Sequence, residues 1–599
     1  MLLERDRVSS VLPSGARRRP PTPALIDVAI ATLAVLLIAS PLLFTTDGFA
    51  PDLTNDLWLA GYQQHVIAAH QHPTLFLQTQ QGVFYPLFAF YGGTLFALTG
   101  ALAALLGGST ILAFEVVTVA AIAAAYGGLF WLARQLGVKG LLAHAPAIVF
   151  VTSAYYVTNL YGRGAWAEFM AVSAFPLVLA ASLRLVRGRS SLGPVACLVA
   201  ASAVFSGSHN ITLLWGSTLA VLALVVYWLA SGRSRALPWR RMLAVAGLIA
   251  LGVGLNAWFL LPDVSYAHRT LISGITEPWN TTGFFNTFGV IFDPLRAVPS
   301  RSGTPALYVQ APVLALVWGL VTLPVVWRER RLRAGVATAL IVLAGLLVLI
   351  TSAGAWSLLP TFFKQIQFAY RLQTYVTLAC AGLVLVGALA LTRRAESGRA
   401  TRADRPLAFG LGLAVAFGVA LCVWQLWVPS THIHAKRSSS YSNRADALRG
   451  PPTLLPRSWG AENEYGDRSL PVLTPPERFA FNPAAVEGDR LAGSISFPPG
   501  LTLATNIGGG PYLVHIGGGA RVIGRTESVG KTAGGYLVLE RKTNGSRPVP
   551  IELTARLSAP VVLGRITTAA AAALLLALAA GAAVRRWRRR RRRAAHPAA

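Results

Sequence analysis

The sequence predicts a polytopic α-helical membrane protein of about 12 spans, with a β-rich domain near its C-terminus. Hydrophobic residues make up 54% of the 599 residues and charged residues only 13%, whereas a soluble domain carries about 25% charged residues. The apolar residues gather in runs of about 20, the length that crosses a bilayer. The basic residues behind the net charge of +29 stand at the ends of these runs, which is the positive-inside pattern and does not indicate nucleic-acid binding.

The apolar runs lie near 24–44, 86–107, 110–133, 141–157, 166–183, 192–207, 211–229, 241–261, 306–326, 334–352, 373–392, 406–428 and 561–584. The first is too long for a signal peptide and is expected to be a retained span. If every run crosses, with the N-terminus inside, basic loops such as "WRERRLR" fall outside. If the run 86–107 does not cross the membrane, every basic loop lies on the cytoplasmic side. This run begins within "YPLFAFYGG", so we expect a re-entrant or interfacial segment there.

Five regions follow from this topology. They are a cytoplasmic basic N-terminus (1–23), a transmembrane module (24–428, with a first outer loop at 45–109), an extracytoplasmic β-rich domain (429–560), a last transmembrane helix (561–584) and an Arg-rich cytoplasmic tail (585–599). Short alternating runs such as "GYLVLERK" predict the strands. Both termini are expected in the cytoplasm of a cell whose plasma membrane holds the protein.

A polar helix, "TNDLWLAGYQQHVIAAHQHP", is predicted at residues 54–73 of the first outer loop. Asp56 stands near its start, where an acid can cap free backbone N–H groups. The same carboxylate could act as a general base that deprotonates an acceptor hydroxyl. The three histidines that follow show no zinc spacing such as HExxH, so no metal site is predicted from them.

Other polar side chains gather at the same ends of the spans. "NLYGRGAWAEFM" holds Tyr161, Arg163 and Glu168, and "FSGSHNITLLWG" holds His209 and Asn210. One alternative is that Arg163 and Glu168 form an ion pair that holds two helices together. The other is that Arg163 binds a phosphate, whose oxygens match the planar guanidinium group. Asn210 or a nearby serine is expected to cap the next helix.

A further patch, "FFKQIQFAYRLQTY", supplies Lys364, Gln367 and Arg371, and Glu115 is expected at the same boundary. Cations beside aromatic residues form an interfacial belt, and they also suit the phosphate of a lipid carrier. Because a charge that faces lipid is costly, we expect these groups to face one cavity. An acid that activates an acceptor, with cations that stabilise a leaving phosphate, is what transfer from a lipid-linked phosphate requires.

Several of these segments together resemble the GT-C superfamily of membrane glycosyltransferases. The chain is most similar to bacterial membrane proteins named "6-pyruvoyl-tetrahydropterin synthase-related", a domain name that implies no pterin chemistry, and more distantly to YfhO-like proteins. The matching segments are "NDLWLAGYQQHV", "GVFYPLFAFYGG", "LYGRGAWAEFMAVSAFPLVL", "SGSHNITLL", "AWFLLPDV" and "IQFAYRLQTY".

The resemblance implies a GT-C fold, an active site under the first outer loop and a polyprenyl-phosphate sugar donor. It carries the family's loop acid onto Asp56. It carries the paired Arg and Glu onto Arg163 and Glu168, the "HN" onto His209 and Asn210, and the "QFxxR" onto Gln367 and Arg371. The family's "FYPP" is "FYGG" here, and "QFPWR" is "QFAYR". No Asp-x-Asp stands in the first loop, so a divalent cation is possible but has no motif of its own.

We therefore expect an extracytoplasmic glycosyltransferase that moves a sugar to an envelope glycan, lipid or protein. Two alternatives remain open. A lipid or glycan transporter would need a path through the membrane and usually shows internal repeats with broken spans. A non-catalytic envelope scaffold would place its function in residues 429–560 and leave Asp56 as a helix cap.

Overall fold

The computed structural model describes residues 22–44, 51–70, 73–75, 88, 91–188, 191–232, 238–266, 287–296, 307–366, 368–402, 404–427, 490–495, 502–508, 512–525, 536–545, 547 and 549–595. The first part of the predicted β-rich region, up to residue 489, lies outside the described residues. So do residues 1–21 of the predicted cytoplasmic N-terminus.

Helices make up most of the described chain. They are α1 (Thr22–Phe44), α2 (Pro51–His70), α3 (Gly93–Leu105), α4 (Thr110–Leu136), η2 (Gly140–Ala143), α5 (Ala145–Val151), α6 (Ala154–Val157), η3 (Thr158–Gly162), α7 (Trp166–Val186), α8 (Leu192–Ser208), α9 (Asn210–Ala230), α10 (Trp239–Gly254), α11 (Ala257–Tyr266), α12 (Phe288–Phe292), α13 (Val313–Val321), α14 (Leu323–Arg328), α15 (Arg333–Thr351), α16 (Ala353–Ser357), α17 (Thr361–Lys364), η6 (Ala369–Leu372), α18 (Gln373–Glu396), α19 (Asp404–Trp427) and α21 (Ala559–Ala595).

The described helices are those of a multi-pass membrane protein. Eight are long and apolar enough to cross a bilayer, and two bent pairs raise the number to as many as ten. The expected number was about 12. It differs because α8 has only 17 residues and because the run at 306–326 is divided between α13 and α14. The larger number stays a prediction.

The predicted non-crossing run, 86–107, contains a short helix. Its described part includes α3, which has 13 residues and is therefore about 20 Å long, less than the thickness of a hydrocarbon core. Gly92, in the left-handed region at φ 55°, precedes the helix. That α3 dips into the membrane and returns stays a prediction.

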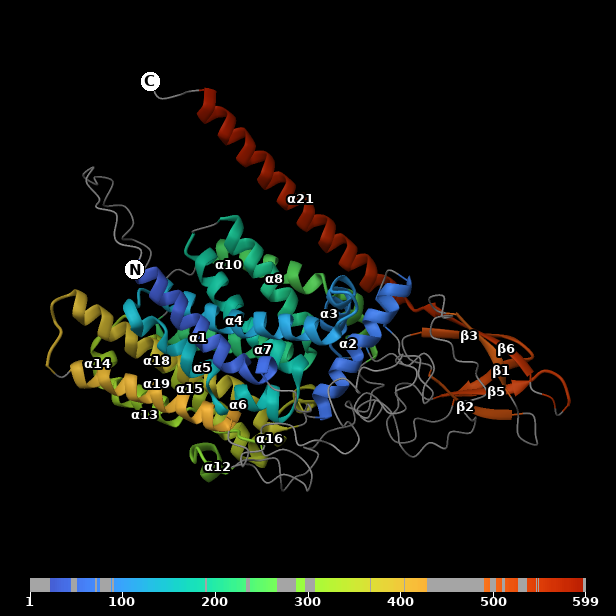
Figure 1. Cartoon of the computed structure of the whole chain (residues 1–599), viewed down its shortest axis with the longest axis horizontal. Helices are drawn as coiled ribbons and strands as arrows, with labels where there is room; N and C mark the ends of the chain where they lie inside the picture. The colour runs from blue at the N-terminus through green and yellow to red at the C-terminus, as the bar shows by residue number, and fades with distance from the viewer. Residues whose placement is uncertain are drawn as a thin grey trace.

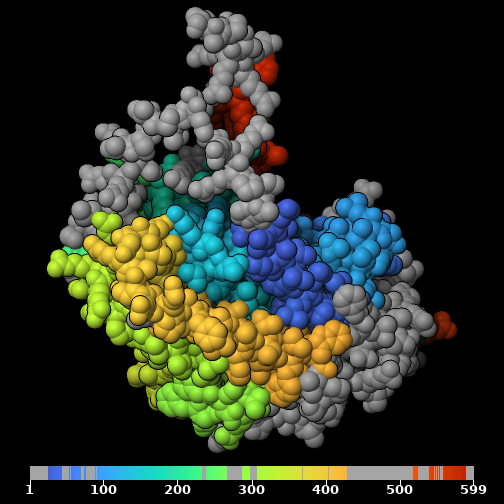
Figure 2. Space-filling model, turned by 60° about the vertical axis from the view of Figure 1, so that its left-hand side comes forward, coloured from blue at the N-terminus to red at the C-terminus, as the bar shows by residue number. Residues whose placement is uncertain are grey.

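The centre of the bundle is built by close packing of α4 against α7 (Figure 1). Gly128 of α4 lies so close to α7 that a Cβ there would come within 2.6 Å of the backbone of Pro176. Trp166, fully buried at the start of α7, donates its indole N–H to Thr118 Oγ1 of α4 at 3.0 Å. Figure 2 shows α1 in blue and α19 in orange on the surface of this bundle.

A sharp bend separates α10 from α11. The two helices meet at 84°. Buried Asn256 fixes the bend from one side, because its Nδ2 donates to Ala203 O at 2.8 Å and to Ser206 Oγ at 2.6 Å, both on α8. From the other side, Thr568 Oγ1 of α21 accepts the N–H of Trp258 at 2.9 Å. This hydroxyl satisfies one of the backbone donors that the first turn of any helix leaves open.

Six strands lie between residues 490 and 557. They are β1 (Arg490–Ile495), β2 (Thr502–Gly508), β3 (Tyr512–Gly518), β4 (Ala520–Arg525), β5 (Tyr536–Arg541) and β6 (Val549–Leu557), and they form two three-stranded antiparallel sheets in the orders β1-β6-β3 and β2-β5-β4. The strands fall inside the predicted β-rich region, whose extracytoplasmic place stays a prediction.

One residue, Ser558, separates β6 from α21. In Figure 1, α21 runs from the sheets past α10 and extends beyond the bundle. The helix continues to Ala595. It therefore contains both the predicted last span at 561–584 and most of the predicted Arg-rich tail.

Candidate functional site

A break and a wide helical turn position the first part of the site. The segment 140–162 bends by 53° between α5 and α6, and η3 then forms a π-helical turn. In that turn the N–H of Arg163 donates to Thr158 O at 2.7 Å. Gly164, at φ 73°, lets the chain reverse before α7 begins. Tyr155, Asn159 and Arg163 follow one another at intervals of four residues along this segment, a spacing that places side chains on one face.

Arg163 is the centre of a buried polar network. Its Nη1 donates to Glu168 Oε2 at 2.9 Å, to the Tyr155 hydroxyl at 3.0 Å and to Asn159 Oδ1 at 3.1 Å. The Tyr155 hydroxyl donates in turn to Glu168 Oε1 at 2.9 Å. Arg163 is 8% exposed and Glu168 4%. The predicted pairing of these two residues is therefore present, and both oxygens of Glu168 are occupied.

A second arginine approaches the same carboxylate from a distant part of the chain. Arg371 lies on η6, and its Nε is 3.5 Å from Glu168 Oε2. This contact is ionic; Arg371 Nε makes no hydrogen bond to a described residue. Two buried guanidinium groups thus share Glu168. We call Tyr155, Asn159, Arg163, Glu168 and Arg371 the Glu168 cluster.

Aromatic rings cover this cluster on the η6 side. The Arg371 guanidinium lies 5.1 Å from the centroid of the Phe368 ring, and that of Arg163 lies 5.7 Å from the Tyr370 ring. Phe368 and Tyr370 are stacked at 5.3 Å. Rings beside guanidinium groups attract the cations through their faces and keep water from one side of the charges.

His209 and Asn210 stand beside the cluster, at the turn between α8 and α9. Nδ1 of His209 accepts the N–H of Thr212 at 3.2 Å and so caps α9. Burial lowers the pKa of His209 to about 3, and the charges of Glu168, Arg371 and Arg163 act on it with smaller effects. The imidazole is therefore neutral at physiological pH. Nδ2 of Asn210 donates to Oδ2 of Asp263, on α11, at 2.8 Å.

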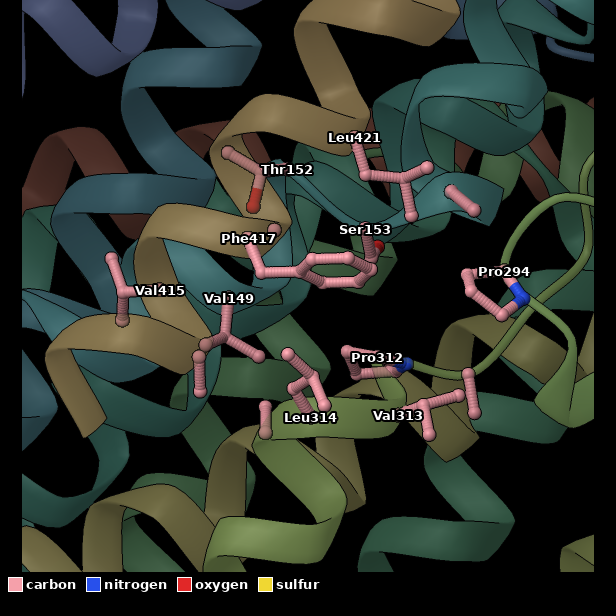
Figure 3. Close-up of a pocket in the computed structure, with 15 residues that line it drawn as sticks. Val149, Thr152, Ser153, Pro294, Pro312, Val313, Leu314, Val415, Phe417 and Leu421 are labelled. Atoms are coloured by element: carbon pink, nitrogen blue, oxygen red, sulfur yellow. The ribbon is translucent and has the colours of Figure 1, made fainter. Parts of the chain in front are cut away.

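An apolar groove is lined by residues of α5, α13 and α19 (Figure 3). It is lined by residues 149, 152–154, 294, 311–315, 414–415, 417–418 and 421. Phe417 and Leu421 of α19 face it from one side, and Pro312 and Leu314 from another. Ala154 lines the groove and is followed by Tyr155 of the Glu168 cluster.

Comparisons with known proteins add a distant likeness. No family model matches the chain, and no curated protein matches it. Among solved structures, the chain is similar to the cryo-EM structure of the arabinofuranosyltransferase AftD from Mycobacteria. The sequence identity is 18% and the TM-score 0.39; the match covers 69% of this chain and 27% of that one. This likeness is too distant to assign a family, and the resemblances stated above stay predictions.

The remaining predicted site residues lie in different surroundings. Asp56 is buried on α2, at 1% exposure. Tyr161 donates its hydroxyl to Ile38 O of α1 at 2.6 Å. Lys364 donates to Ser357 O at 2.9 Å, and Glu115 is half-buried on α4. Gln367 lies outside the described residues. The roles of these five residues stay predictions.

Tyr155, Asn159, Tyr370 and Asp263 were not among the predicted site residues. Tyr155 carries no charge and stands in the apolar run 141–157, and Tyr370 stands beside other aromatic residues, where a tyrosine is typical of an interface belt. Asp263, in the segment "AWFLLPDV", was expected at the outer boundary of the spans with the other ionisable groups. The signal that could have given it a role is its place just after the apolar run 241–261, since an acid near a span is costly unless it has a partner.

No group of three or more His, Cys, Asp and Glu side chains among the described residues could hold a metal ion.

Proposed function

We propose that this protein is a membrane glycosyltransferase that moves a sugar from a polyprenyl-phosphate carrier to a cell-envelope glycan, lipid or protein. The observation that carries the proposal is the pair of buried arginines, Arg163 and Arg371, which share the single carboxylate of Glu168. A buried cation is costly unless it is paired and hydrogen-bonded. Among the described residues, Arg371 contacts a carboxylate only through the 3.5 Å ionic contact with Glu168, which leaves it able to bind a second anion.

A phosphate suits this place for geometric reasons. The guanidinium group is planar and presents parallel N–H groups that match two oxygens of a phosphate. Arg371 approaches Glu168 through Nε, so its two terminal amino groups are available to a phosphate. The aromatic rings of Phe368 and Tyr370 beside the arginines make the surroundings less polar, which strengthens any charge–charge contact there.

The apolar groove supports a donor with a lipid tail. It is lined by valine, leucine, proline and phenylalanine side chains and is adjacent in sequence to Tyr155. A polyprenyl chain in the groove would be apolar along its length, while its phosphate would lie near the arginines. A soluble nucleotide sugar would gain nothing from such a groove.

The proposed reaction follows from this placement. The acceptor hydroxyl loses its proton to a carboxylate, and its oxygen attacks the anomeric carbon of the sugar. The bond between that carbon and the phosphate oxygen breaks, and the phosphate leaves with the electron pair. Arg371 and Arg163 stabilise the negative charge as it develops, which is the usual largest contribution to such a rate. Asp56 is the carboxylate that the resemblance suggests for the proton.

The test compares binding and transfer. The protein is reconstituted in nanodiscs and titrated with polyprenyl monophosphate and with the matching polyprenol. Transfer is measured with a panel of polyprenyl-phosphoryl pentoses and hexoses, labelled in the sugar, and with membranes from cells that lack the protein as acceptors. We expect the wild type to bind the phosphate form more tightly and to transfer at least one sugar of the panel.

Arg371→Gln and Arg371→Lys are the diagnostic variants. Glutamine removes the positive charge, whereas lysine keeps the charge but lacks the planar guanidinium group. We therefore expect the rate of sugar transfer to fall about 10²–10³-fold for Arg371→Gln and by less for Arg371→Lys. Arg399→Gln, at an exposed arginine beyond α18, is the matched control. Equal affinity of the wild type for polyprenyl phosphate and polyprenol, or no effect of Arg371→Gln, would contradict the proposal.

A further inference from the structure

The turn between α14 and α15, residues 329–332, concentrates positive charge at one end of the bundle. Four exposed arginines stand in it or directly beside it: Arg328, Arg330, Arg331 and Arg333. Glu329 is the one acid among them. The positive-inside pattern predicts that this turn lies at the cytoplasmic surface of the membrane, which carries anionic lipid headgroups.

This turn is held against the end of α18. Val326 and Leu332 are buried on either side of it and belong to the same hydrophobic cluster as Leu389 of α18. The N–H of Leu332 donates to Glu329 O at 2.8 Å, which closes the turn. Arg393 follows Leu389 by four residues and therefore lies on the same face of α18. The packing thus directs the face that carries Arg393 toward the arginines of the turn.

Arg393 has a cation as its strongest charged neighbour. It is partly buried, and the charge of Arg331 acts on it more strongly than that of either nearby acid. These acids are Glu329 and Glu396, and Glu396 also pairs with Lys139. Neither Arg331 nor Arg393 forms a salt bridge or a side-chain hydrogen bond with a residue that the structure describes. Two cations in this arrangement repel each other and would both be stabilised by an anion between them.

Trp327 indicates where that anion comes from. Its side chain is 50% exposed at the end of α14, and an exposed tryptophan at the end of a span is typical of the headgroup level of a membrane. Arg333 Nε donates to Trp327 O at 2.6 Å, and its guanidinium group lies 6.0 Å from the centroid of the indole ring. α15 begins here without an acid in its first turn, so its free N–H groups add to the positive potential.

We propose that Arg331 and Arg393 together bind the phosphate group of an anionic phospholipid. The planar guanidinium groups present pairs of N–H groups that match phosphate oxygens, and Trp327 contacts the same lipid at the base of its headgroup. This site is separate from the Glu168 cluster. α18 has 24 residues, with Arg371 just before its start and Arg393 in its last turn, and is therefore about 36 Å long. The inference goes beyond the proposed function and does not depend on it.

The first experiment compares melting temperatures in nanodiscs of phosphatidylcholine with those in nanodiscs that also contain phosphatidylglycerol. A ligand that binds the folded protein stabilises it, so we expect phosphatidylglycerol to raise the melting temperature of the wild type. Arg331→Gln/Arg393→Gln should lose most of this rise. In phosphatidylcholine alone, the same variant should melt no lower than the wild type, because the repulsion between the two cations is gone.

The matched control removes the same charge from a neighbouring loop. Arg399→Gln/Arg402→Gln changes two exposed arginines beyond α18 and should keep the rise. Affinity is measured by native mass spectrometry of the protein in detergent. We expect phosphatidylglycerol to bind the wild type about tenfold or more tightly than Arg331→Gln/Arg393→Gln, since charge-assisted hydrogen bonds to a phosphate are lost. Neither diacylglycerol, which lacks the phosphate, nor inorganic phosphate, which lacks the chains, should reproduce the rise.

The contrary outcomes are distinct. An equal rise for the wild type and Arg331→Gln/Arg393→Gln overturns the proposal. An equal loss in the two double variants does the same, because it would show attraction to the total charge and no defined site. A rise with inorganic phosphate alone would assign the arginines to a soluble anion and overturn the lipid. A lower melting temperature of Arg331→Gln/Arg393→Gln in phosphatidylcholine would show that the two arginines serve the fold. None of these results depends on sugar transfer.

Discussion

Glu168 shows at the scale of one residue why the site is buried and yet charged. Its carboxylate accepts from Tyr155 and Arg163 and lies 3.5 Å from Arg371. Replacing both partners of a buried pair with apolar residues can be neutral, but removing one partner leaves an uncompensated charge. The carboxylate is therefore the member of the cluster whose loss affects stability most.

We expect Glu168→Gln to destabilise the protein by about 3–5 kcal/mol, because two guanidinium groups then lose their charged partner. The midpoint of denaturant unfolding in detergent measures the effect. Glu396→Gln removes the acid of an exposed pair with Lys139 and should cost about 0–1 kcal/mol. Equal shifts for the two variants would show that Glu168 contributes no more than a surface pair.

His209 predicts a dependence of stability on pH. Its folded pKa of about 3 lies below the ordinary value of 6.5, so between these values the unfolded state binds more protons. The contribution of His209 to stability is therefore full above about pH 6.5 and is lost as the pH falls toward 3. His209→Asn keeps a capping side chain without a titrating ring. Its melting temperature should fall less than that of the wild type between pH 7 and 4.5; an identical fall would contradict the assignment.

Part of this site could be predicted from the sequence at the residue scale. Arg163, Glu168 and Arg371 stand out because charges near span ends are rare, and the structure brings all three together. The partnership between Arg371 and Glu168 could not be predicted, because no periodicity connects segments so far apart. Lys364 was predicted beside them; α17 ends at that residue, its side chain donates to Ser357 O, and its role stays a prediction.

At the scale of elements, α21 is more than a tether for the sheets. It packs along α11 and α10, and its Gly564 lies where a Cβ would come within 2.4 Å of Ala257 O. The contact is with backbone, which cannot rotate out of the way as a side chain can. The sequence predicted a final span here, but it could not show which helices that span contacts. The faces of an alanine-rich helix have nearly the same composition, so the sequence does not distinguish the packed face from the others.

The two glycines of α21 predict effects of opposite sign. Gly581→Ala meets only the flexible end of Arg585 at 3.8 Å, so it should stabilise the helix by up to about 1 kcal/mol. Gly564→Ala forces α21 away from α11 and should lower the melting temperature despite the same gain in helix propensity. If both substitutions raise the melting temperature, the contact between α21 and α11 is not part of the folded protein.

At the scale of the whole molecule, the assignment of each loop to the cytoplasmic or the outer side of the membrane depends on the sequence alone. The alternation of basic loops predicts that the loop after α4 faces the cytoplasm and that the region of α16 faces outward. The structure supplies exposed positions in both: Lys139, with 69% of its side chain exposed, and Leu358, which is 85% exposed.

Cysteine labelling tests this orientation directly. Lys139→Cys and Leu358→Cys are made in a Cys197→Ser background, since Cys380 and Cys422 are buried. A membrane-impermeant maleimide should label Leu358→Cys in intact cells and Lys139→Cys only after permeabilisation. The background protein without added cysteines is the control. Labelling of both positions from the same side would place the Glu168 cluster and the basic loops in one compartment.

The wide turn at Thr158–Gly162 has a consequence for relatives of this chain. A π-helical turn holds about one residue more than the α-helical turn that it replaces, and here it directly precedes Arg163, which bonds to Tyr155 and Asn159. Removing Leu160 would restore an ordinary helix and rotate Arg163 by about 100° around the axis. Aligned against proteins that lack the arginine pair, the chain should therefore show a single-residue gap between Val157 and Arg163, and those that share the pair should share the additional residue.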